Sequence, residues 1–146
     1  MLEEQMGDQI ISFIEDLGFR PYVQIPFFYG RIDFVGIKND ECMVIESKVK
    51  KWRDALSQVL RYGYGADSSY IALPSNTAKY VYNNHRDVFI KYGIGLIEVG
   101  YIANILIPSI NNNYSHVYKK IILNEIKMRE DKSSDRLNIF KEKYKL

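Results

Sequence analysis

The sequence predicts an α/β fold in which a mixed central sheet is flanked by helices. Apolar residues recur at helical spacing in three segments, residues 3–17, 52–63 and 78–91. Residues with high β-propensity dominate five others, residues 19–29, 32–37, 42–49, 70–73 and 94–99. The resulting order of one helix, three strands and then alternating helices and strands is typical of a sheet with helices packed on it.

The first helix and strand are delimited by glycine and proline. Gly18 follows residues 3–17 at the position where a helix end favours glycine. Pro21 and Pro26 lie in the strand 19–29 and lack the amide donor that a central strand needs. This strand is therefore expected at an edge of the sheet or to be bent.

The next two strands form a predicted hairpin that places charged residues together. Asn39 and Asp40 are residue types that favour the turn between them. With the turn centred there, Asp33 lies opposite Glu46, and the alternation of side chains puts Lys48 on the same face.

The opposite face of this hairpin is expected to carry Ile32, Phe34, Met43 and Ile45. Both faces are then apolar near the turn, which predicts a central, covered hairpin.

The rest of the chain continues the α/β pattern. Residues 52–63 and 70–73 should form a right-handed parallel crossover, with Trp52 anchoring the helix in the core. Residues 101–110 are apolar and ambiguous between helix and strand. The remaining expectations are a loop at residues 111–113, a helix at residues 119–129 and a lysine-rich end that frays.

Length and composition predict one intracellular domain. At 146 residues, with 47% apolar and 26% charged residues, the chain can bury a core without disulfides or metals. We expect a single domain at residues 1–146, with a core at about 3–99 and a C-terminal extension at about 100–146. The lone Cys42 is expected to be a buried hydrophobe. Neither a secretory signal nor a membrane span is evident, so a soluble, cytoplasmic protein without a membrane partner is expected.

The paired acids of the hairpin indicate metal-dependent chemistry. Opposed side chains in an antiparallel pair have Cβ atoms about 5 Å apart, and like charges there repel. Lys48 offers one positive charge against the two negative charges of Asp33 and Glu46. A divalent ion would complete the balance, and Mg²⁺ is typically held by one or two carboxylates, waters and phosphate oxygens. Phosphodiester hydrolysis is the chemistry that this arrangement serves.

At these residues the chain resembles the PD-(D/E)XK nuclease superfamily, over about residues 3–73. The matching elements are an acidic first helix, Asp33, the Glu46-Ser47-Lys48 run and a following helix. The resemblance implies a restriction-endonuclease-like α-β-β-β-α-β core and cleavage of DNA with Mg²⁺, for which Mn²⁺ can substitute. It implies Asp33 and Glu46 as metal ligands, with Lys48 beside the nucleophile.

Two details of the resemblance leave questions open. Ile32 replaces the proline of the motif, which leaves the metal ligands intact. Many members of the superfamily add a glutamate from the first helix, and here Glu3 and Glu4 compete for that role. The favoured alternative for each of them is a surface acid near a helix start.

The predicted helix 52–63 adds further candidates. Gln58 and Tyr62 resemble the Q-x-x-x-Y element of the RecB-like branch, and residues four apart share a helix face. Core packing is the alternative role for Tyr62. The nearby basic residues could contact the DNA backbone or form a solvated helix face, and they are Lys50, Lys51, Arg53 and Arg61.

Other residue types give weaker signals. His85 and His116 lack ligand spacing. The tyrosines could stack on bases, but Tyr70, Tyr80 and Tyr92 lie among apolar residues and are expected in the core or at an interface. An exposed apolar part of residues 92–110 would indicate a homodimer.

Three subclasses of nuclease remain open: an exonuclease, a restriction-like endonuclease and a junction resolvase. A non-catalytic DNA-binding or regulatory protein on the same fold and a structural interaction module are the alternatives from other classes.

Overall fold

The computed structural model describes residues 3–110 and 115–144, with side chains described at 3–110 and 115–132. The helices are α1 (Glu3–Asp16), α2 (Trp52–Tyr62), α3 (Ser75–Tyr92) and α4 (His116–Tyr144), with a 3-10 turn η1 (Gly63–Gly65). The strands are β1 (Arg20–Phe27), β2 (Gly30–Lys38), β3 (Glu41–Ser47), β4 (Ser68–Pro74), β5 (Gly95–Val99) and β6 (Ala103–Ile107). The predicted α/β class and the α-β-β-β-α-β order are confirmed.

The strands form one six-stranded mixed sheet in the order β1-β2-β3-β4-β5-β6. β3, β4 and β5 run parallel to one another, and the other neighbouring pairs are antiparallel. The parallel connection from β3 through α2 to β4 is confirmed, as is the position of the proline-containing β1 at an edge. The ambiguous residues 101–110 supply the sixth strand at the opposite edge.

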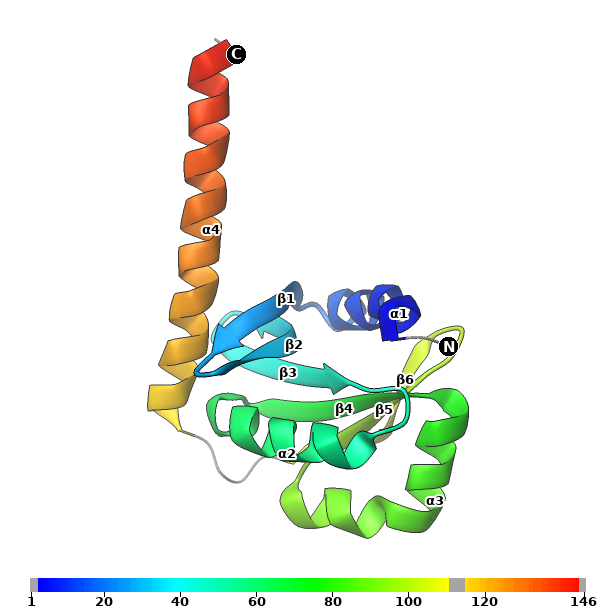
Figure 1. The fold of residues 1–146 in the computed structure, drawn as a ribbon. Coiled ribbons are helices and arrows are strands. Elements are labelled where there is room, and N and C mark those ends of the chain that lie inside the picture. Colours follow the sequence, from blue (N-terminus) through cyan, green and yellow to red (C-terminus); the bar gives the residue numbers. More distant parts are fainter. Residues whose placement is uncertain (1–2, 111–114, 145–146) are drawn as a thin grey trace.

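Helices cover both faces of this sheet (Figure 1). α1 packs on one face through Met6, Ile10 and Ile14, which lie one helical turn apart and are buried. α2 and α3 pack on the other face around Trp52, which is buried as predicted, and Phe89. The β2–β3 hairpin is thus central and covered.

The register of the hairpin agrees with the prediction. Phe34 pairs with Ile45 and Ile37 with Cys42, and Asn39 adopts the left-handed conformation in the turn. This register brings Asp33 and Glu46 to facing positions just beyond the last paired residues, Phe34 and Ile45.

The predicted face of Ile32 is wrong. Ile32 packs with Val35 and Ile25 on the face opposite to Phe34. The cause lies in β1, where Gln24 has a φ of 53° and is unpaired in the ladder with β2. The left-handed residue shifts the side-chain alternation of both strands at this point.

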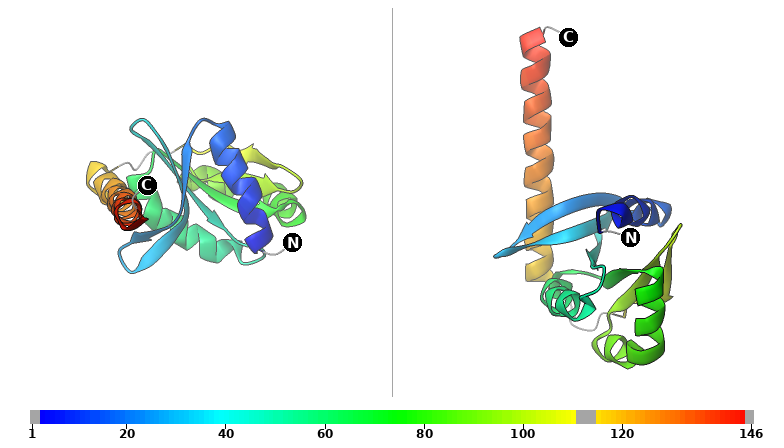
Figure 2. Two further views of the ribbon diagram at one scale, coloured as in Figure 1. Left: turned by 90° about the horizontal axis from the view of Figure 1, so that it is seen from above. Right: turned by 45° about the vertical axis from the view of Figure 1, so that its right-hand side comes forward.

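α4 closes the remaining side of the hairpin and then extends away from the sheet (Figures 1 and 2). Ile122 and Ile126 are buried in a cluster with Val44 and Tyr62. The helix continues to Tyr144, past the predicted end at residue 129, because residues 130–144 contain neither glycine nor proline. The loop predicted at residues 111–113 lies outside the described residues. None of the described helices combines the length and apolarity needed to cross a membrane.

Candidate active site

Asp33 and Glu46 lie side by side where β2 and β3 stop pairing. The backbone N–H of Asp33 lies 3.5 Å from Glu46 Oε2. The backbone N–H and the hydroxyl of Ser47, which follows Glu46, donate to Asp33 Oδ2 at 3.1 and 3.3 Å. Each acid is therefore held by the strand that carries the other.

Glu46 is the more deeply buried acid of the pair. Its residue is only 2% exposed. The pKa of its carboxyl is raised from 4.5 to about 8, first by burial and then by the charge and side-chain hydrogen bonding of Asp33, while the Asp33 N–H and Lys48 oppose the shift. In the absence of a bound cation, the site therefore favours a protonated Glu46 at neutral pH.

Lys48 lies near enough to lower the pKa of Glu46 but does not neutralise the pair. It is half-buried, and its backbone N–H donates to Ala72 O on β4. Among the described side chains, neither Asp33 nor Glu46 forms an ion pair with a lysine or arginine. Within the described residues, the charges of the two acids are thus not balanced by an ion pair.

Gln24 and Ser47 also contact Asp33, although neither was among the residues predicted for this site. Gln24 Nε2 donates to Asp33 Oδ1 at 3.2 Å, and Ser47 holds the other oxygen. Ser47 could have been noticed as the middle residue of the Glu-Ser-Lys run. Gln24 carries no sequence signal, since its role depends on an unusual backbone conformation in the neighbouring strand.

Tyr62 supports the site from α2. It is buried, and its hydroxyl donates to Arg31 O at 3.0 Å, two residues before Asp33. Burial and then the charge of Glu46 raise the pKa of the Tyr62 phenol. Because the hydroxyl is bonded to the backbone of β2, Tyr62 combines the predicted core role with fixing the start of that strand.

Gln58 lies one turn before Tyr62 on α2. Its Oε1 atom is buried and has no hydrogen-bond partner among the described residues. A buried amide oxygen ordinarily has a partner. Gln58 therefore has an acceptor that a water or ligand could use.

Glu3 and Glu4 are exposed in the first turn of α1. The described residues contain no group of three His, Cys, Asp or Glu side chains arranged around a common metal position. Neither glutamate therefore joins Asp33 and Glu46 as a third acid ligand in this structure.

The predicted basic residues fall into two places. Lys50, Lys51 and Arg53 are exposed in the connection from β3 and the first turn of α2, directly after Lys48. Arg53 lies over the Trp52 ring, with its guanidinium carbon 4.3 Å from the ring centroid. Arg61 is exposed at the far end of α2, about 12 Å from Arg53 along the helix axis.

The other predictions have mixed outcomes. Cys42 is buried as expected, and burial raises the pKa of its thiol to about 12. Of the tyrosines expected in the core or at an interface, Tyr70 is buried in the core, whereas Tyr80 and Tyr92 are exposed on α3 and do not belong to the core. His85 lies between aromatic rings rather than beside the acids, 5.1 Å from the Trp52 centroid.

Comparisons with known proteins identify a shared fold. No family model and no curated protein sequence matches the chain. The SPO1766 protein of unknown function from Silicibacter pomeroyi superposes with a TM-score of 0.70 over 94% of this chain and 92% of its own, at 15% identity. The structure of Pyrococcus furiosus SfsA in complex with Ca²⁺ has a TM-score of 0.44 at 10% identity and covers 77% of this chain and 64% of its own. The first similarity shows that this fold recurs, and the second is too weak to carry an argument.

Proposed function

We propose that the chain is a Mg²⁺-dependent deoxyribonuclease in which Asp33 and Glu46 hold the ion and Lys48 assists the reaction. The observation that carries the proposal is the pair of facing carboxylates, one of them almost fully buried, with no cationic partner among the described side chains. Two such acids favour a doubly charged ion between them, since burying unpaired charge costs several kcal/mol.

The residues present fit Mg²⁺ better than a metal that needs a full protein cage. Mg²⁺ typically uses one or two carboxylates and completes its shell with water and phosphate oxygens. That preference agrees with a site of two acids. When bound, the ion would polarise a phosphate oxygen and make a water molecule more acidic.

The chain's own groups would orient the reactants. Asp33 is fixed through both of its oxygens by Gln24 and Ser47. Lys48 supplies a positive charge beside Glu46, where it can stabilise the charge that grows on a phosphoryl group. Tyr62 acts by anchoring β2, and the candidate role of Gln58 is to hold water.

The surface around the acids suits a nucleic acid strand. Lys50, Lys51 and Arg53 follow Lys48 on one side, where they can contact phosphates. The β1–β2 turn exposes Phe28 and Tyr29, the latter about 13 Å along the strand from Asp33. Exposed rings of this kind can stack on unpaired bases. Single strands and DNA ends are therefore included among the substrates to be tested.

The test incubates the purified protein with linear duplex, single-stranded, supercoiled and four-way-junction DNA. Each substrate is tested with Mg²⁺, with Mn²⁺ and with chelator. Cleavage is expected with either metal and not with chelator, and the substrate pattern separates an exonuclease from an endonuclease or a resolvase. Lys48→Ala and Asp33→Asn should each lower the rate at least about 100-fold.

Matched variants control for loss of folding and for contamination. Lys132→Ala removes an exposed lysine from α4, and Asp40→Asn removes an exposed acid at the opposite end of the hairpin, so both should cleave at the wild-type rate. Cleavage that persists in Lys48→Ala and Asp33→Asn would identify a contaminant. Metal-independent DNA binding without any cleavage would favour the non-catalytic alternative.

A further inference from the structure

Gln24 adopts a backbone conformation that its residue type rarely takes. Its φ is 53°, and it interrupts the pairing of β1 with β2 between Val23 and Ile25. The interruption turns its side chain toward β2, where Nε2 donates to Asp33 Oδ1 at 3.2 Å. Since carboxylate oxygens only accept hydrogen bonds, the N–H side of the amide is the side that fits.

The unusual backbone at Gln24 is held from α4. The guanidinium of Arg129 donates to the carbonyl oxygens of Val23 and Gln24, the second at 2.7 Å. These bonds join segments more than 100 residues apart in the chain. An arginine guanidinium can donate two hydrogen bonds from two nitrogens at once, which the single ammonium of lysine cannot do in this geometry.

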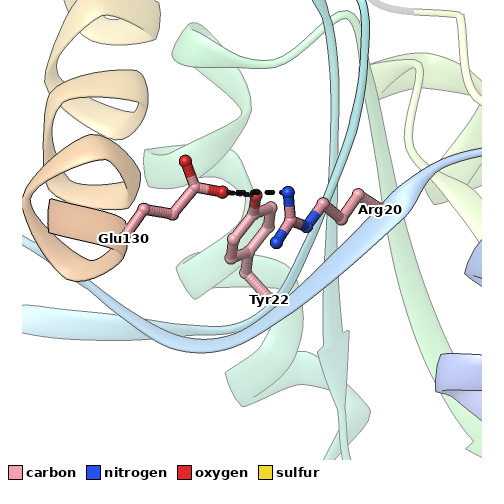
Figure 3. Close-up of polar contacts among 3 residues, drawn as sticks. All are labelled: Arg20, Tyr22 and Glu130. Atoms are coloured by element: carbon pink, nitrogen blue, oxygen red, sulfur yellow. Dashed lines mark hydrogen bonds and ion pairs between the residues drawn. The ribbon is translucent and has the colours of Figure 1, made fainter. Parts of the chain in front are cut away.

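Glu130, the next residue of α4, also binds β1. Glu130 accepts a hydrogen bond from the hydroxyl of Tyr22 and forms an ion pair with Arg20 at 3.4 Å (Figure 3). Arg129 and Glu130 of α4 thus bind neighbouring residues of β1, from Arg20 to Gln24. The position of α4 and the conformation at Gln24 are linked.

We propose that Gln24 is a positioning residue for the metal ligand Asp33, and that Arg129 of α4 acts through it. The role as ligand support rests on the proposed nuclease function. One oxygen of Asp33 accepts from the Gln24 amide and the other from Ser47, so the plane of the carboxylate is set from two sides. Groups that orient a metal ligand in this way typically change metal affinity 10–100-fold when they are removed.

Two substitutions separate positioning from backbone strain. Gln24→Met keeps the side-chain length and the strained backbone but removes the amide, whereas Gln24→Gly also relieves the strain. Gln24→Gly should therefore melt at a higher temperature than Gln24→Met. Both variants should bind Mn²⁺ about 10-fold more weakly than the wild type in calorimetric titrations. Asn39→Gly relieves the same kind of backbone strain in the turn at the other end of β2. It should leave the affinity for Mn²⁺ unchanged.

A double-mutant cycle tests the role of Arg129. Arg129→Met should weaken Mn²⁺ binding in the wild-type background and have little further effect in Gln24→Gly, because the amide through which it acts is already absent. Lys127→Met removes an exposed basic residue elsewhere on α4 and should not alter the affinity. Equal effects of Arg129→Met in both backgrounds would overturn the coupling.

A measurement without metal keeps the proposal independent of the nuclease assay. The backbone N–H of Ser47 donates to Asp33, so its hydrogen exchange reports whether the carboxylate is held in place. Loss of protection at Ser47 in Gln24→Met and Arg129→Met supports the positioning role even if the wild type binds no Mn²⁺, which would refute only the metal site. Unchanged protection at Ser47 together with wild-type Mn²⁺ affinity would overturn the proposal.

Discussion

Replacing Glu46 by glutamine should change how the stability of the metal-free protein depends on pH. The pKa of Glu46 is raised from 4.5 in an unfolded chain to about 8 in the folded protein. The folded state therefore holds its proton more tightly, and stability falls as pH rises from about 4.5 to about 8. That interval corresponds to a loss of up to about 5 kcal/mol in the free energy of unfolding. Glu46→Gln mimics the protonated acid and should not suffer this loss.

Urea unfolding at intervals from pH 5 to pH 9, with chelator present, measures the effect. The wild type should lose stability relative to Glu46→Gln as the pH rises, while the contributions of other groups cancel between the two proteins. Glu41→Gln, at an exposed position of the same strand, should keep a constant difference from the wild type. A constant difference between Glu46→Gln and the wild type over this range would refute the reasoning.

Metal addition should narrow the difference in stability between the wild type and Glu46→Gln at high pH. At pH 8, Mg²⁺ at 100 times its dissociation constant should stabilise the wild type by about 2.7 kcal/mol. Glu46→Gln, which lacks one of the two carboxylates, should gain less at the same concentration. Equal gains in both proteins would remove Glu46 from the metal site.

Three further predictions follow from buried and charged groups. Because burial raises the pKa of Cys42 to about 12, a thiol reagent at pH 8 should label it only on unfolding, and rapid labelling of the native protein would contradict its burial. If Lys50, Lys51 and Arg53 contact phosphates, replacing all three by alanine should reduce the slope of log affinity against log salt by roughly 2 to 3, measured by fluorescence anisotropy with DNA. An unchanged slope would exclude them from the DNA interface. Tyr62→Phe loses a hydrogen bond to a backbone carbonyl of β2 and should lower the free energy of urea unfolding by about 1 kcal/mol. No loss of stability would mean that the hydroxyl does not anchor the strand.

The pairing of Asp33 with Glu46 was predictable because it depends on local signals. The turn residues Asn39 and Asp40 fix the register, which leaves Asp33 and Glu46 just beyond the pair of Phe34 and Ile45. Ile32 lies on the other face because the left-handed Gln24 in β1 shifts the side-chain alternation. The residue pattern within the hairpin does not indicate this shift. The contribution of Arg129 was beyond sequence reasoning for the same reason, since it depends on where a distant helix docks.

The chemistry of the hairpin is not explained by the needs of the fold. Glu46 is flanked across the sheet by Ile71 and preceded on its own face by Val44, both fully buried. An apolar residue at this position would pack in the same layer without the ionisation penalty, and buried charges are often replaceable in that way at no cost to stability. A second acid at the facing position increases the penalty instead of relieving it. Departures of this kind from the rules that make a sheet stable are expected at functional sites. The similarity to the SPO1766 protein concerns the backbone alone and gives no information about Asp33 and Glu46. A test of function therefore has to begin with these two residues.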